Sequence, residues 1–205
     1  TPRRQRQMCI RDRFLVVQYC VPQHALSRLA GRLANSEKEW LKNFLITRFV
    51  HAFAVNMQDA LEEDPLQYKS FNDFFTRALK PSARPVDHSG ISSPADGAIS
   101  QLGEIEQQTI FQAKGRHFNL HDLVGGDAKL TDTFSNGKFA TIYLSPKDYH
   151  RVHMPCDGKL VKSIYIPGDL FSVNETTSKG IDNLFARNER LVCEFETPNG
   201  TMVLI

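Results

Sequence analysis

The chain has 205 residues, 41% of them hydrophobic and 23% charged, which is the ordinary balance of a globular protein with one core or one core plus a helical appendage. Its four cysteines show neither a CxxC pair nor regular spacing, which argues against a disulfide framework and a zinc knuckle and fits a reducing compartment. No apolar run reaches the roughly 18 residues that span a bilayer.

The net charge of +2 hides an uneven distribution, because residues 1–57 carry ten Lys or Arg against three acids. A basic N-terminal part favours an anionic partner, either nucleic acid or an anionic membrane surface. Residues 1–13 weaken that interpretation, since they have no apolar period and are typical of translated vector sequence. We expect a non-native tail there. Residues 14–57 alone keep five bases and two acids.

Two helices are expected next, over residues 23–34 and 37–57. Ser36 and Glu39 have the spacing of a capping box at the start of the second helix. Large apolar side chains recur along this helix at Trp40, Leu41, Phe44, Leu45, Phe49 and Phe53, and the basic Lys38, Lys42 and Arg48 fall largely beside them. An aromatic and basic amphipathic helix is compatible with a membrane interface, although most such stripes pack on the protein's own core.

A short helix with Ser70 as its cap is predicted over residues 70–79, followed by a linker that Pro81 and Pro85 bound. From residue 91 onward, short β-type runs alternate with turn residues. The runs are residues 98–102, 139–144, 158–166, 190–195 and 202–205. The pattern predicts an α+β fold, in which N-terminal amphipathic helices precede a mostly antiparallel β domain of sandwich or barrel-like type. We expect a helical, membrane-associating region over 14–80 and a β-rich domain over 81–205, which stops inside an apolar run and is therefore expected to be incomplete.

The strongest chemical signal is the pair His150 and His153, which follows an apolar run and precedes a Pro and a Cys-Asp-Gly turn. Loops at strand ends are common places for reactive groups, and histidine suits proton transfer near neutral pH. An acid, Asp96, stands far upstream in Pro-Ala-Asp-Gly, where a simple Asp-Gly turn is the alternative interpretation. The histidines alone also fit a solvated strand end, or two metal ligands that need a third from His117, His121 or Asp96.

Six segments spread along the chain resemble motifs of bacterial phosphatidylserine decarboxylases, in the same order and at approximately the same spacing. They are residues 70–77 (SFNDFFTR), 94–103 (PADGAISQLG), 112–115 (QAKG), 143–155 (YLSPKDYHRVHMP), 167–174 (PGDLFSVN) and 184–190 (LFARNER). The resemblance covers residues 14–205, which is everything except the suspected tail.

The resemblance implies a proenzyme that cuts itself at a Gly-Ser bond in a Leu-Gly-Ser-Thr motif and converts the serine into a pyruvoyl cofactor. Asp96 then matches the acid and His153 the histidine of an Asp-His-Ser triad. His150 matches a histidine used in decarboxylation, and Tyr143 matches a substrate-binding position. A serine is a weak nucleophile until a base oriented by a carboxylate takes its proton. The pyruvoyl carbonyl binds the substrate amine and acts as an electron sink while phosphatidylserine becomes phosphatidylethanolamine.

The chain departs from the family in one respect, because none of its twelve glycines is followed by a serine. The cleavage site and the pyruvoyl precursor are therefore not among these residues, and we expect the pyruvoyl-forming serine beyond Ile205. No residue of this chain is expected to bind a cofactor. We expect a C-terminally truncated fragment of the proenzyme's catalytic domain, inactive by itself.

For the complete enzyme the resemblance implies a peripheral membrane protein on the cytoplasmic face of the bacterial inner membrane. Its expected partners are phosphatidylserine, an anionic membrane surface, the small pyruvoyl-bearing chain left by self-cleavage and, as one option, a second copy in a homodimer. Nucleic acid and metal are not expected. Two alternatives stay open: a metal-dependent hydrolase built on His150 and His153, and a non-catalytic β domain that docks on membranes. A downstream Leu-Gly-Ser-Thr motif, or metal analysis of the protein, distinguishes them.

Overall fold

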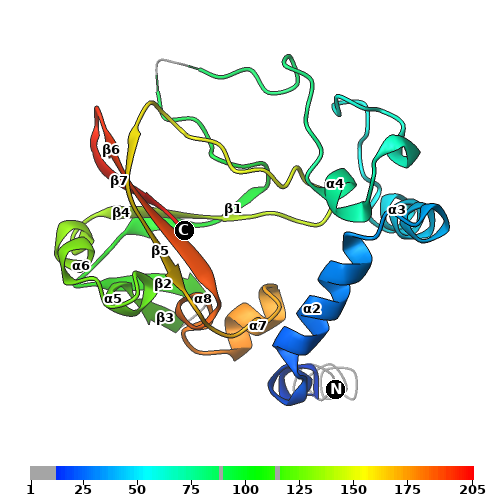
Figure 1. The fold of residues 1–205 in the computed structure, drawn as a ribbon. Helices are drawn as coiled ribbons and strands as arrows, with labels where there is room; N and C mark the ends of the chain where they lie inside the picture. The colour runs from blue at the N-terminus through cyan, green and yellow to red at the C-terminus, as the bar shows by residue number, and fades with distance from the viewer. Residues whose placement is uncertain (1–12, 88–89, 114–115) are drawn as a thin grey trace, which may run out of the picture. The chain divides into compact units, whose positions relative to one another are not determined.

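The computed structural model describes residues 13–87, 90–113 and 116–205, which form two compact units (Figure 1). Of the described residues, 13–26, 101–141 and 159–205 form the sheet unit, and 27–100 and 142–158 form the helical unit. Each unit has an apolar core of its own. The expected tail lies outside the described residues except for Arg13. The tail and the expected domain boundary at residue 80 stay predictions.

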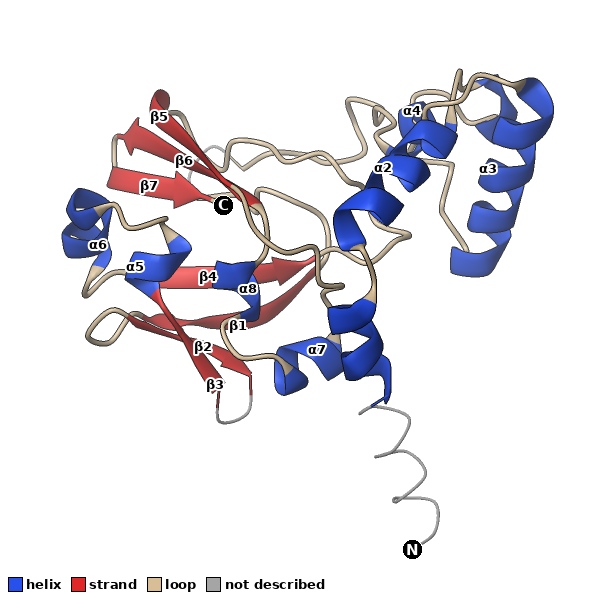
Figure 2. Ribbon diagram, turned by 60° about the horizontal axis from the view of Figure 1, so that its bottom comes forward, coloured by secondary structure: helices blue, strands red, loops and turns tan. Residues whose placement is uncertain are grey.

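Helices α3 (Glu39–Phe53) and α4 (Phe71–Phe75) build the helical unit together with the 3-10 helix η1 (Pro65–Gln67), and they lie side by side in Figures 1 and 2. α2 (Gln23–Ala34) has the bounds that the sequence predicts. The core consists of large apolar side chains, several of them aromatic. They are the buried Ile46, Val55, Tyr68 and Phe74, with Phe49, Val50, Met57 and Phe71 packed against them.

The two predicted helix caps have different outcomes. Ser70 caps α4 as expected, because its Oγ accepts a hydrogen bond from the backbone N–H of Asp73 at 3.1 Å. That helix ends at its fifth residue, however, and not at residue 79. The capping box of Ser36 and Glu39 is wrong. Lys38 occupies the N-cap of α3 without a side-chain bond, so Glu39 begins the helix instead of lying at its third position.

α3 is shorter than predicted and carries apolar side chains on two opposite faces. It ends at Phe53 instead of residue 57, because Ala54 turns the chain with a left-handed φ of 50°. Ile46 is fully buried, whereas Trp40 and Phe44 are 72% and 60% exposed and Phe53 is exposed as well. The aromatic stripe of α3 is therefore partly exposed. None of the described helices is long and apolar enough to cross a membrane.

The strands of the described residues pair into three small sheets (Figure 2). β1 (Ala98–Glu104) pairs with β4 (Lys138–Tyr143), and β2 (Thr109–Ala113) pairs with β3 (Arg116–Asn119). β5 (Lys159–Ile166), β6 (Arg190–Thr197) and β7 (Gly200–Leu204) form the third sheet in that order, and its pairs are antiparallel, as is β2–β3. The predicted α+β class is confirmed, and the five predicted strands match β1, β4, β5, β6 and β7 to within two residues.

Sequence reasoning misses β2, β3 and four short helices of the sheet unit. The helices are α5 (Leu120–Leu123), α6 (Ala128–Phe134), α7 (Glu175–Gly180) and α8 (Leu184–Arg187). Elements of four to seven residues are too short to show a helical period, and the capping residues Asn119, Asp127 and Asn174 are the better signal for three of them. The buried core of this unit consists of Ile105, Ile110, Phe118, Leu120, Val124, Leu130 and Val192.

A buried glutamine ties β2 to two of these helices. Gln112 is 3% exposed, and its Nε2 donates to the carbonyl oxygens of Ser178 and Ile181, each at 2.9 Å. Its Oε1 accepts from the backbone N–H of Leu184 at 3.0 Å. One side chain thus satisfies backbone groups at the end of α7 and at the start of α8.

Replacing Gln112 by alanine should destabilise the sheet unit, because the three backbone partners lose their hydrogen bonds. Each buried group left unpaired costs about 1–3 kcal/mol, so we expect the free energy of unfolding to fall by at least about 2 kcal/mol. Urea unfolding followed by circular dichroism measures the change. Lys129→Ala, at an exposed position of α6 in the same unit, is the control and should have an effect below about 0.5 kcal/mol. Equal effects of the two substitutions would contradict the role of Gln112.

Candidate functional site

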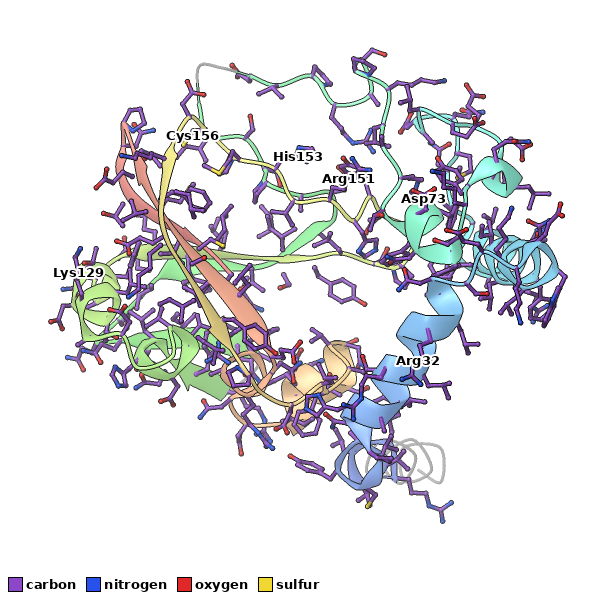
Figure 3. The ribbon with its side chains drawn as sticks, viewed as in Figure 1. Arg32, Asp73, Lys129, Arg151, His153 and Cys156 are labelled. Atoms are coloured by element: carbon purple, nitrogen blue, oxygen red, sulfur yellow. The ribbon has the colours of Figure 1, made fainter. Side chains whose placement is uncertain are left out.

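Two segments far apart in the sequence are joined by their backbones in the helical unit. The N–H of His153 donates to the carbonyl of Pro94 at 2.7 Å, and the N–H of Ser92 donates to the carbonyl of Pro155 at 2.8 Å. Asp96 follows the first segment directly. The fold therefore brings the chain around Asp96 beside the chain around His153, although 57 positions separate the two residues. Figure 3 labels His153 on this irregular stretch after β4.

Gly97 allows the chain after Asp96 to lie against the end of β4. Its φ of +130° is unfavourable for residues with a side chain, and a Cβ at this position would collide with the carbonyl oxygen of Tyr143. The glycine therefore serves a close approach between two backbones. Because Tyr143 ends β4, this approach brings the predicted substrate-binding residue next to the predicted acid.

A cleft of about 590 Å³ opens at this point. Its walls carry charged groups of both signs and hydroxyl groups. The lining residues are Arg84, Ser93, Ala95, Asp96, Gly97, Ala98, Tyr143, Ser145, Lys147 and Asp148. Asp96 and Tyr143 thus share one cleft, whereas neither candidate histidine is among the described residues that line it. Charges of both signs suit a polar ligand that itself carries both.

The two histidines have different partners. Nε2 of His150 faces the carbonyl oxygen of Ser145 at 3.0 Å, and because a carbonyl only accepts, Nε2 carries the proton in this bond. The same ring stacks on Phe75, with 4.2 Å between the ring centroids. Nε2 of His153 lies 2.8 Å from the hydroxyl of Tyr149, which is buried. The two imidazoles are therefore held independently, although they are only three residues apart.

The carboxylate of Asp96 binds an arginine. Nε of Arg84 donates to both carboxylate oxygens at 2.9 and 3.1 Å, and Nη2 donates at 2.6 Å. Nη1 of the same guanidinium bonds Asp59 at 3.1 Å. The hydrogen bonds from Arg84 hold the pKa of Asp96 below its ordinary value against the opposing effect of burial, and the charges of Arg84, Arg77 and His153 add to the lowering. Asp96 is therefore ionised at neutral pH.

The triad that the resemblance implies would join Asp96 to His153. Among the described residues, Asp96 bonds Arg84 instead and His153 bonds Tyr149. Hydrogen bonds of catalytic groups often form or tighten only in the reacting complex. A direct bond between this acid and this histidine stays a prediction.

The pyruvoyl-forming serine expected beyond Ile205 lies outside the described structure, so its position stays a prediction. Ile205 itself directly follows β7 in the sheet unit and is 53% exposed. It does not line the cleft, whose lining residues all belong to the helical unit. Ile205 is therefore not a residue of the candidate site.

Sequence reasoning misses four side chains that hold the candidate residues in place: Phe75, Arg77, Arg84 and Tyr149. Arg77 is only 3% exposed, and burial lowers the pKa of its guanidinium. Its Nη2 donates to the carbonyl of Lys147 at 3.3 Å, and its cation lies 5.6 Å from the centre of the Phe74 ring. Nε and Nη1 have no hydrogen-bond partner among the described residues. The available signal is an arginine two residues after the aromatic pair Phe74 and Phe75.

Metal binding receives no support from the geometry. Among the described residues, no three His, Cys, Asp or Glu side chains are grouped as a metal site requires. His117 in β3 and His121 in α5, the other candidate ligands, belong to the sheet unit, whereas His150 and His153 belong to the helical unit.

Replacing Arg84 by methionine should remove a pH-dependent part of the stability. Because the pKa of Asp96 is lowered in the folded chain, its ionised form contributes stability above the ordinary Asp pKa of about 3.9, and this contribution is lost as the pH falls through the lowered value. The difference in unfolding free energy between wild type and R84M should therefore be largest near neutral pH and shrink in acid. The Arg84 side chain is 47% exposed, so we expect at most about 1 kcal/mol.

Urea unfolding at a series of pH values from acid to neutral measures this difference. Lys80→Met, which removes an exposed ion pair with Glu63 in the same unit, is the control for the loss of a surface cation. A difference between wild type and R84M that stays constant across the series would show that Arg84 does not lower the pKa of Asp96.

Comparison with known proteins places these residues in one family. A family model described as phosphatidylserine decarboxylase matches residues 71–205, and one described as PSD matches residues 14–54. The chain is 56% identical over 202 residues to the phosphatidylserine decarboxylase proenzyme of Alcanivorax borkumensis. The matched region covers 97% of this chain and 69% of that protein. The proenzyme of Polaromonas naphthalenivorans is 57% identical over 194 residues (94% and 67% covered), and that of Bordetella pertussis is 56% identical over 194 residues (94% and 65%). The chain belongs to the phosphatidylserine decarboxylase family.

Proposed function

We propose that this chain supplies the Asp and His residues of an enzyme that removes CO2 from phosphatidylserine to give phosphatidylethanolamine. The match of residues 71–205 to the family carries the proposal, because it spans Asp96, His150 and His153. Enzymes of this family are pyruvoyl-dependent lyases made as proenzymes. The serine that becomes the pyruvoyl group is not among these 205 residues and is expected beyond Ile205. The small pyruvoyl-bearing chain and a homodimer stay predictions.

In self-cleavage, His153 acts as the general base for the serine, and Asp96 orients the imidazole and stabilises its charged form. Two observations support this pairing. The Pro94 carbonyl accepts a bond from the His153 backbone, and Arg84 keeps Asp96 ionised. A carboxylate offers about four lone-pair positions, so an imidazole N–H can bind Asp96 beside the guanidinium.

In decarboxylation, His150 supplies the proton that the product carbon needs. Its Nε2–H is bound to the Ser145 carbonyl, so the ring takes up and returns a proton at Nδ1. The pyruvoyl group, when bound, supplies a carbonyl that accepts electrons. The cleft beside Asp96 fits such a small carbonyl group, because the buried Ser145 hydroxyl has no partner among the described residues and Tyr143 offers a second hydroxyl. Tyr143 also contacts the substrate head group in this proposal.

Replacing each of the two histidines by alanine should have different effects in a full-length proenzyme that carries the Gly-Ser bond. His153→Ala should block self-cleavage and hence all turnover, because it removes the base that activates the serine. His150→Ala should leave cleavage largely intact and lower turnover by about 10²–10⁴-fold, the usual contribution of a general acid or base. A denaturing gel shows cleavage, and an assay for phosphatidylethanolamine measures turnover.

The 205-residue chain, which has no Gly-Ser bond, is the control and should show neither cleavage nor turnover. Normal cleavage of the His153→Ala proenzyme would remove His153 from the triad. Loss of cleavage in His150→Ala with turnover preserved would reverse the two roles.

We also propose that α3 attaches the enzyme to anionic lipid on the cytoplasmic face of the inner membrane, because the proposed substrate is itself a membrane phospholipid. Trp40, Phe44 and Arg48 follow one another at intervals of one helical turn, and all three are exposed. Exposed aromatic and basic side chains on one face are typical of helices that lie in a membrane interface. Lys42 is not included in this surface, because its Nζ donates to the carbonyl of Leu66 at 2.7 Å and joins α3 to η1.

Flotation with liposomes tests this attachment. Recovery should increase with the content of anionic lipid and should fall when Trp40 and Phe44 are both replaced by alanine. Arg48→Glu should weaken binding by on the order of tenfold, because each base near an anionic surface contributes about 1 kcal/mol. Lys69→Glu, at an exposed position of the same unit outside α3, is the charge-matched control. Equal losses for the two charge reversals, or equal recovery with neutral lipid, would rule out docking through α3.

A further inference from the structure

Three consecutive residues at the end of α4 contact the loop that carries the histidines. The ring of Phe75 stacks on His150 with an interplanar angle of 25°. The carbonyl of Thr76 accepts a hydrogen bond from Nε of Arg151 at 2.6 Å, and Arg77 donates to the loop backbone through Nη2. Figure 3 labels Arg151 on the loop and Asp73 on α4. The end of α4 is thus attached to this loop at three points.

The attachment starts from a rigid base. α4 is capped by Ser70, and Phe74 is fully buried in the core of the helical unit. The ring of Phe49 contacts the rings of Phe71, Phe74 and Phe75 with centroid distances of 5.1, 6.0 and 5.8 Å, each nearly edge to face. Phe75 therefore contacts the aromatic core through Phe49 and Phe71 and also stacks on His150.

This contact decides which nitrogen of His150 exchanges protons. Nε2 is committed to the Ser145 carbonyl, and a ring rotation that broke this bond would have to move the imidazole against the face of Phe75. A neutral imidazole has one N–H and one acceptor nitrogen, so Nδ1 is the acceptor as long as Nε2 keeps its proton. A loop side chain without the stacked ring would be free to populate both tautomers.

We infer that Phe75 is a positioning residue, whose ring holds the His150 imidazole as the Nε2–H tautomer with Nδ1 open for proton exchange with the substrate. The inference rests on the proposed role of His150 in decarboxylation. It predicts that Phe75 affects turnover but not self-cleavage, because His153 is held by Tyr149 and by the Pro94 carbonyl instead.

The activity test uses the full-length proenzyme. Phe75→Leu should be cleaved normally and lose about 10- to 100-fold in kcat with little change in KM, since misplacing a catalytic group by about 1 Å costs this much. Phe75→Tyr keeps the aromatic face and should restore most of the rate. Phe71→Leu is the matched control, because Phe71 belongs to the same aromatic cluster and stacks on Phe75 but not on His150.

A double-mutant cycle separates positioning from a general loss of structure. In a His150→Ala background, Phe75→Leu should have no further effect on kcat, because the side chain that it positions is gone. An effect of Phe75→Leu that equals that of Phe71→Leu, or that persists at full size without His150, would overturn the inference.

A second measurement does not depend on activity. Long-range ¹H–¹⁵N spectra of the 205-residue chain, recorded where an ordinary imidazole is neutral, report which ring nitrogen of His150 bears the proton. Wild type and Phe75→Tyr should show the Nε2–H form alone, and Phe75→Leu should show a several-fold larger share of the other tautomer. An unchanged share would refute positioning by Phe75. If His150→Ala proenzyme turned over normally, the proposed role of His150 would fail, while these spectra would still decide whether Phe75 holds the ring.

Discussion

Backbone pairing between residues 92–94 and 153–155 is the constraint on which the site depends. Neither segment belongs to a strand, yet two hydrogen bonds align them in an antiparallel manner. Gly97 extends this alignment, because only a residue without Cβ allows the start of β1 to approach the carbonyl of Tyr143 so closely. The acid and the second histidine therefore acquire a common frame from main-chain contacts.

Some polar side chains around this frame use all their hydrogen-bonding groups, and others leave some of them unpaired. Arg84 donates to two carboxylates and a carbonyl. In contrast, two buried nitrogens of Arg77 and the hydroxyl of Ser145 have no hydrogen-bond partner among the described residues. Buried polar groups of this kind cost about 1–3 kcal/mol each, so the surrounding packing must compensate. The aromatic core beneath α4 provides that packing, with Phe74 directly under the Arg77 cation. Unsatisfied polar groups supported by a rigid core are more typical of a functional site than of a structural one.

The parts of the fold that sequence could predict are those that long local patterns determine. α2 and five strands follow from periodicity and turn residues, and the Ser70 cap follows from one local hydrogen bond. The prediction of a capping box at Ser36 is wrong because Lys38 is extended, so that α3 begins at Glu39. No sequence motif indicates this later start. At the site, the family resemblance singles out Asp96 and the two histidines, but not their partners. Arg84 lies in a linker, and its bond to Asp96 exists only because the folded chain brings the linker back.

The two histidines owe their different surroundings to different parts of the chain. His153 takes its backbone position from the segment before β1 and its ring contact from Tyr149. His150 takes its ring contact from α4, which is anchored in the helical core. Because these supports come from different parts of the chain, the two histidines have separate contacts, as the two separate roles proposed for them require.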